Sequence, residues 1–116
     1  MFLFLCAGPA TLIASNLCFG SDYDPVGSFQ ILEAGELETL RVDYKPSLPD
    51  GEAKVLKLAD KNGQVNPEYT TSDNIHFDFR FDKYPLKVSV GQIFSLSEES
   101  GSGEALCVTV YGYYAF

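Results

Sequence analysis

Apolar and polar side chains alternate every second residue along much of this chain, and this pattern constrains its fold more than any other feature. The pattern is clearest in the segment Ile75–Asp82. Its apolar members are Ile75, Phe77, Phe79 and Phe81, and its polar members are His76, Asp78, Arg80 and Asp82. Because successive side chains of a β-strand point to opposite faces, the segment is predicted to be a strand with one buried face and one solvent-facing face.

Further alternating runs predict a fold made of strands alone. Leu40, Val42 and Tyr44 form one apolar set, and Leu86, Val88 and Val90 form another. No window combines helical periodicity with a capping residue, and the closest, residues 32–40, is interrupted by Gly35. Turn signals separate the runs at residues 21–25, 49–51, 60–63, 72–74 and 100–103. We therefore expect seven to nine strands in an all-β, antiparallel β-sandwich of jelly-roll-like form, as one domain over residues 1–116.

The last stretch of the chain, residues 105–116, is apolar or aromatic on both faces. A strand covered on both sides belongs in the middle of a sheet or at a subunit interface. Gly112 interrupts this run, and a glycine in a strand marks a bulge or the close approach of another backbone.

The first stretch, residues 1–19, is also apolar. It lacks the basic start of a signal peptide, and Gly8 and Pro9 interrupt both a signal sequence and a membrane-spanning helix. We expect two short strands, Phe2–Ala7 and Thr11–Cys18, joined by a Gly-Pro turn. This segment is predicted to pack within the fold or against a neighbouring subunit.

The charge of the chain excludes two classes of partner. The sequence has 16 acidic and 8 basic residues, a formal net charge of −8, and no Lys or Arg before Arg41. Affinity for a phosphate backbone comes mainly from Lys and Arg. We therefore expect no nucleic-acid partner and no membrane partner.

The three cysteines, Cys6, Cys18 and Cys107, are scattered and form no CxxC motif. With the single histidine His76 they reach the ligand number of a zinc site but match no known spacing. Buried free thiols are the favoured interpretation, and a bridge between Cys6 and Cys18 remains open.

No pattern in the sequence indicates catalysis. His76 shares a strand face with Asp78, a pair we interpret as part of an ordinary surface ladder rather than a catalytic dyad. The neighbouring carboxylates Glu98 and Glu99 lie in a predicted loop, and Asp22 and Asp24 lie in a predicted turn. No phosphate-binding loop or hydrolase motif is present. The oxygen-rich loops 21–24 and 60–63 leave calcium as an alternative, but neither has EF-hand spacing. We expect no enzyme activity and no cofactor.

The C-terminal part resembles the last strands of small phage and viral jelly-roll proteins. The resemblance is carried by Val88–Leu96, with its Gly91-Gln92 corner, by the loop 100–103, and by Val108–Tyr114. It covers about the last 30 residues and implies a capsid-associated, decoration or spike-like subunit without catalytic residues.

The expected function is therefore that of a structural, assembly-forming virion protein that associates with itself and with other virion or surface-assembly proteins. The predicted interface residues are aromatic and lie near the two ends of the chain: Phe2, Phe4, Tyr111, Tyr113, Tyr114 and Phe116. The alternative is a secreted or cell-surface module that binds carbohydrate through stacked tyrosines, or a subunit of an extracellular filament.

Overall fold

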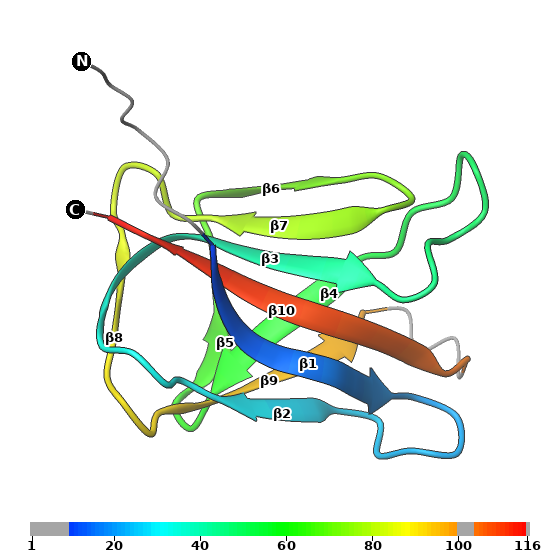
Figure 1. Ribbon diagram of the computed structural model, residues 1–116, viewed down its shortest axis with the longest axis horizontal. Helices are drawn as coiled ribbons and strands as arrows, with labels where there is room; N and C mark the ends of the chain where they lie inside the picture. The colour runs from blue at the N-terminus through cyan, green and yellow to red at the C-terminus, as the bar shows by residue number, and fades with distance from the viewer. Residues whose placement is uncertain (1–9, 100–103, 116) are drawn as a thin grey trace.

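The structure, a computed structural model, describes residues 10–99 and 104–115 and builds them into strands without a helix. Ten strands form two antiparallel sheets (Figure 1). The strands are β1 (Thr11–Phe19), β2 (Gly27–Gln30), β3 (Gly35–Tyr44), β4 (Leu56–Asp60), β5 (Gly63–Val65), β6 (Tyr69–Ser72), β7 (His76–Arg80), β8 (Leu86–Val88), β9 (Ile93–Glu98) and β10 (Leu106–Tyr114).

The strand order is that of one long antiparallel hairpin rolled into two layers. β1 pairs with β10, β2 with β9, β3 with β7, and β4 with β5. The larger sheet has the order β1-β10-β3-β7-β6, with β8 also paired to β3, and the smaller sheet has the order β2-β9-β4-β5. Figure 1 shows β10 of the larger sheet crossing in front of β4 of the smaller one. This arrangement confirms the predicted all-β, jelly-roll-like sandwich.

The predicted alternation places the core correctly. Phe77, Phe79 and Phe81 are buried, and so is the apolar set of β3. Ile75 is the exception, because it lies in the turn before β7 begins and is 51% exposed. The period-two pattern therefore identifies the inward-facing residues of β3 and β7, and it fails at Ile75 because this residue precedes the strand.

The strand boundaries correct several details of the prediction. The segment expected at Thr11–Cys18 is confirmed as β1, whereas the expected strand Phe2–Ala7 and the loop 100–103 lie outside the described residues. The described residues hold ten strands rather than seven to nine, because the short strands β5 and β6 carry too few residues to show a pattern. The turns expected at 60–63 and 72–74 are confirmed between β4 and β5 and between β6 and β7.

β10 lies between β1 and β3, so its predicted central position in a sheet is confirmed. Gly112 in this strand faces the core. A Cβ atom there would lie 2.8 Å from Cδ2 of Leu37 and 2.9 Å from Cδ1 of Ile13. The close approach therefore comes from two core side chains and not from another backbone, and the register shift of β10 against β3 follows between Tyr113 and Tyr114.

We predict that Gly112→Ala lowers the free energy of unfolding by about 1–3 kcal/mol, because the added methyl group overpacks this part of the core. Chemical denaturation followed by circular dichroism measures the change. Gln64→Ala, at an exposed position of β5, is the control and is expected to change stability by less than about 0.5 kcal/mol. Equal stability of Gly112→Ala and the parent protein would contradict this account of the glycine.

A disulfide links the first and last strands. Cys18 and Cys107 are directly opposite each other in the β1–β10 pair, and their sulfur atoms are bonded. The prediction of free thiols is therefore wrong for these two residues, and so is the alternative bridge from Cys6 to Cys18. The sequence could not reveal the pairing because 89 positions separate the two cysteines, and only the sheet brings them side by side.

The disulfide closes a loop that includes most of the chain, so we predict a large effect on stability. Replacing both cysteines with alanine is expected to lower the free energy of unfolding by about 2–4 kcal/mol, mainly because the unfolded chain gains freedom. Peptide mapping by mass spectrometry without reductant should yield a fragment that joins Cys18 to Cys107. Recovery of both residues as free thiols from protein handled without reductant is the outcome that would refute the bridge.

Candidate interaction surfaces

The outward face of the larger sheet carries a ladder of polar and aromatic side chains. Cross-strand pairing aligns Tyr111 of β10 with Arg41 of β3, Arg41 with Asp78 of β7, and Asp78 with Thr71 of β6. Directly paired residues project from the same face of a sheet, so these four side chains form one row across it. We call this outward surface the polar face.

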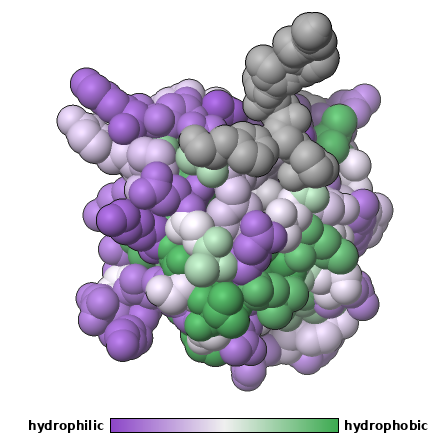
Figure 2. Space-filling model, turned by 60° about the vertical axis from the view of Figure 1, so that its left-hand side comes forward, coloured by the Kyte–Doolittle hydropathy of each residue, from purple (hydrophilic) through white to green (hydrophobic). Residues whose placement is uncertain are grey.

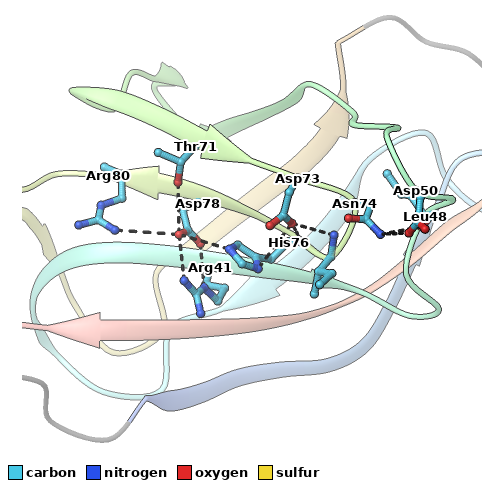
Figure 3. A network of polar contacts seen from close by, with 10 residues as sticks. Arg41, Leu48, Asp50, Thr71, Asp73, Asn74, His76, Asp78 and Arg80 are labelled. Carbon is cyan, nitrogen blue, oxygen red and sulfur yellow. Dashed lines mark hydrogen bonds and ion pairs between the residues drawn. The ribbon is translucent and has the colours of Figure 1, made fainter.

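Asp78 is the centre of the polar face (Figure 3). Its Oδ1 accepts a hydrogen bond of 2.9 Å from Nε of Arg41, and its Oδ2 accepts one of 3.1 Å from Nη2 of the same arginine. The Thr71 hydroxyl donates to Oδ2 at 3.4 Å, and His76 Nε2 and Arg80 Nη1 each lie 4.0 Å from Oδ2. The carboxylate therefore receives a bidentate contact from the arginine of β3 and has further polar neighbours on β6 and β7.

The structure corrects the prediction that Asp78 faces solvent, since this residue is only 2% exposed. β7 lies inside the sheet, between β3 and β6, and long side chains on both neighbouring strands cover its outer surface. The other two buried polar residues of the described chain, Thr39 and Thr109, lie on the same face. The polar face is thus a second, hydrogen-bonded layer rather than a simple wet surface.

The charges of this layer are held by hydrogen bonds. The bonds to Asp78 raise the pKa of Arg41 above its usual value. Asp73 accepts hydrogen bonds from the backbone N–H groups of His76 and Ile75, at 3.0 and 2.8 Å, and these bonds lower the pKa of its carboxyl group. His76 therefore lies between two carboxylates that already have structural partners.

We predict that Arg41→Leu lowers the free energy of unfolding by about 3 kcal/mol, because it leaves the buried Asp78 carboxylate without its main partner. The double variant Arg41→Leu with Asp78→Val should regain most of that loss, since no buried charge remains. A double-mutant cycle measured by chemical denaturation gives the coupling between the two residues. Additive effects of the two substitutions would show that the pair does not act as a unit.

The loops considered for calcium have other roles in the structure. The carboxylate of Asp60 accepts a hydrogen bond of 2.8 Å from the backbone N–H of Asn62, which stabilises the turn between β4 and β5. Residues 21–24 form the turn that leaves β1, where Gly20 donates its N–H to the carbonyl of Asp24. Within residues 10–99 and 104–115, no cluster of three or more His, Cys, Asp or Glu side chains has the geometry of a metal site.

The structure separates the predicted interface tyrosines. Tyr111 and Tyr113 lie half-buried on the polar face, and the Arg41 guanidinium carbon is 5.6 Å from the centre of the Tyr113 ring. Tyr114 instead packs against the core, and its hydroxyl donates a 2.7 Å hydrogen bond to the carbonyl of Glu33. The predicted interface residues Phe2, Phe4 and Phe116 lie outside the described residues.

A tight turn at one end of the sandwich is fixed by hydrogen bonds. In the turn Ser89–Gln92, the N–H of Gln92 donates to the carbonyl of Ser89, and Gly91 has a φ of +88°. The Gln92 side chain accepts a 3.0 Å hydrogen bond from the N–H of Ser89. The N–H of Gly91 donates to the carbonyl of Ile31, and the N–H of Ile31 donates to the carbonyl of Gln92. The turn is therefore fixed both within itself and to the connection between β2 and β3.

Three large apolar residues lie in this fixed turn or next to it, and we call them the end patch. Val90 is 67% exposed, Ile93 is 53% exposed, and Leu32, next to Ile31, is 63% exposed. Val90 and Ile93 line a hollow of about 550 Å³ whose opposite wall is the turn at residues 60–62. Figure 2 looks toward this end of the molecule and shows apolar surface gathered beside hydrophilic surface.

The end patch was missed in the sequence. Val90 continues the alternating set of Leu86 and Val88, which predicted a buried position. β8 ends at Val88, and the chain then turns, so Val90 lies at the tip of the turn instead of on the inner face. The signal that could have located it is Gly91, because a glycine directly after Val90 favours a turn with Val90 and Gly91 as its central residues.

No protein-family model, curated protein or solved structure matches this chain. In the described part of the chain, no helix has the length and apolar character needed to cross a membrane.

Proposed function

We propose that this chain is a non-enzymatic structural subunit that associates with copies of itself, as a capsid-associated protein of a virion does. The observation that carries the proposal is the end patch, in which Leu32, Val90 and Ile93 are each more than half exposed. Exposed apolar side chains that are grouped in one place mark surfaces that other molecules cover.

The rigidity of the patch supports a binding role. Val90 is at the tip of a turn held by the backbone bonds of Ser89, Gln92 and Ile31 and by the Gln92 side chain. A surface that is fixed before binding loses little conformational freedom on association. The end patch is therefore suited to contact with a partner of fixed shape.

The charge distribution allows a second copy to be that partner. Two chains that each carry a net charge of −8 repel one another except where the local charge is low. Among the described residues that line the hollow beside the patch, only Asp60 and Lys61 are charged, and their charges are opposite. Copies of the chain can approach here with less repulsion than elsewhere on an acidic surface.

The fold is compatible with a virion role and also with the carbohydrate-binding alternative, because jelly rolls occur in viral capsid and lectin domains. For carbohydrate, the favouring observation is Tyr69, which is 45% exposed on the polar face. However, the Arg80 guanidinium lies 5.8 Å from the centre of the Tyr69 ring, and Arg41 lies similarly over Tyr113. These arginines occupy ring faces that a sugar would use, so assembly is the stronger proposal.

We predict that the protein self-associates at micromolar concentration and that Val90→Asp weakens this association by at least about tenfold, because a carboxylate is placed in the contact. Sedimentation velocity over a concentration series measures the change. Val55→Asp is the matched control, since Val55 is 55% exposed but lies in the connection between β3 and β4, outside the end patch.

Two results would overturn the proposal. One is a monomer at every concentration tested, and the other is an equal effect of Val55→Asp and Val90→Asp. Glycan-array binding that is lost in Tyr69→Ala or Tyr113→Ala, by a monomeric protein, would support the carbohydrate-binding module instead.

A further inference from the structure

β6 is a strand with one bonded edge and one free edge. All four of its residues, Tyr69–Ser72, are exposed, and within residues 10–99 and 104–115 the strand pairs with β7 alone. Figure 1 shows it at the outer margin of the larger sheet. A free edge presents unpaired N–H and C=O groups, which serve as a template for another strand.

We propose that β6 pairs in antiparallel fashion with β6 of a second copy, around a two-fold axis at Thr71, so that two larger sheets become one continuous sheet. This contact would be a second interface of the self-association proposed above and rests on that proposal. An interface of this kind uses the same surface on both subunits.

The direction of the backbone N–H and C=O groups of β6 decides which of its residues can bond to a second copy of the strand. The N–H of Asp73 donates to the carbonyl of His76, so Asp73 is directed toward β7. Inward and outward bonding alternate along an antiparallel strand, and Thr71 and Tyr69 therefore also face β7. Thr70 and Ser72 are left with their backbone N–H and C=O groups directed to the free edge.

Because of this alternation, there is a register in which the outward-directed backbone groups of the two copies lie opposite each other. With Thr71 opposite Thr71 of the partner subunit, Thr70 lies opposite Ser72 of the partner subunit, and both have outward-directed backbone groups. The pairing forms about four backbone hydrogen bonds. Facing threonines form a favourable cross-strand pair, and none of the four residues of β6 carries a charge that would repel its counterpart.

The other sheet edges are protected in ways that β6 is not. β1 has two register irregularities and a positive φ of 56° at Asn16, and such bulges disrupt a regular edge. β5 has only three residues. β2 lies against β1, since a Cβ atom on Gly27 would be 2.9 Å from the Phe19 ring. In the described chain, β6 is the edge strand of more than three residues that has a regular register from its first to its last residue, no charged side chain and no covering strand.

Contacts within the subunit also hold β6 in place for pairing. The Tyr69 hydroxyl donates to the Asp82 carboxylate, and the Thr71 hydroxyl donates to Asp78. Both bonds are on the polar face and leave the outward backbone groups of the strand free. The edge is therefore ordered without a partner, which lowers the entropic cost of adding a strand.

The test uses a proline at the position whose N–H is directed outward. Thr70→Pro removes that donor but none of the bonds to β7, and proline is tolerated at such positions of edge strands. Thr70→Val is the matched control, because it keeps the N–H. In sedimentation velocity, Thr70→Pro is expected to weaken the two-fold contact by at least about tenfold, while Thr70→Val retains it. Circular dichroism and the melting temperature establish that both variants are folded.

A cross-linking experiment tests the register independently of proline. In a Cys6→Ser background, Thr71→Cys is expected to form a disulfide-linked dimer under mild oxidation, because the two residues face each other across the axis. Tyr69→Cys in the same background is expected to form far less, since its partner in this register is Asp73 of the second subunit. Equal cross-linking at the two positions, or none at Thr71→Cys, would rule out the register.

The combined variants separate this inference from the proposed function. If Val90→Asp leaves dimers that Thr70→Pro converts to monomers, the β6 contact is established. If Thr70→Pro leaves the association of the parent protein unchanged, the β6 contact is wrong while self-association through the end patch stands. A parent protein that is monomeric throughout overturns both.

Discussion

The pairing of β10 with both β1 and β3 is the constraint on which the rest of the structure depends. It brings together segments from the beginning, the middle and the end of the described chain, and it places the buried side chains of Val108 and Val110 at the centre of the larger sheet. The Cys18–Cys107 disulfide fastens one of these two pairings covalently. In the larger sheet, β7 and then β6 follow outward from β3, and β6 forms the margin.

The buried carboxylate of Asp78 gives the larger sheet two organised faces. Its inner face is an ordinary apolar core, and its outer face is a network in which Arg41, Thr71, His76 and Arg80 surround one carboxylate. A buried charge is tolerated only where partners satisfy it, so this network fixes the side chains of three neighbouring strands. The ordered β6 edge, which is the basis of the proposed two-fold contact, follows from the same network through Thr71.

How much could be predicted from the sequence differed from element to element. The inner residues of β3 and β7 followed from alternation, because the period of a strand is a local property of the backbone. The burial of Asp78 and the exposure of Val90 were not predictable in this way. The first depends on the strands that flank β7, and the second depends on where β8 ends. The end patch combines Leu32, from the connection after β2, with Val90 and Ile93, from the turn after β8 and the start of β9, and these segments are distant in the sequence.

By itself, the sequence determined the fold class, the identity of most core positions and the acidic charge, because these depend on the order and composition of side chains along a strand. Only the tertiary structure decided which cysteines pair, which polar side chain is buried and which strand edge is left free. Each of these depends on which strands become neighbours, and in a jelly-roll-like sandwich those neighbours come from opposite ends of the chain. Local patterns carry no information about such long-range pairing, whereas they fully specify the alternation that makes it possible.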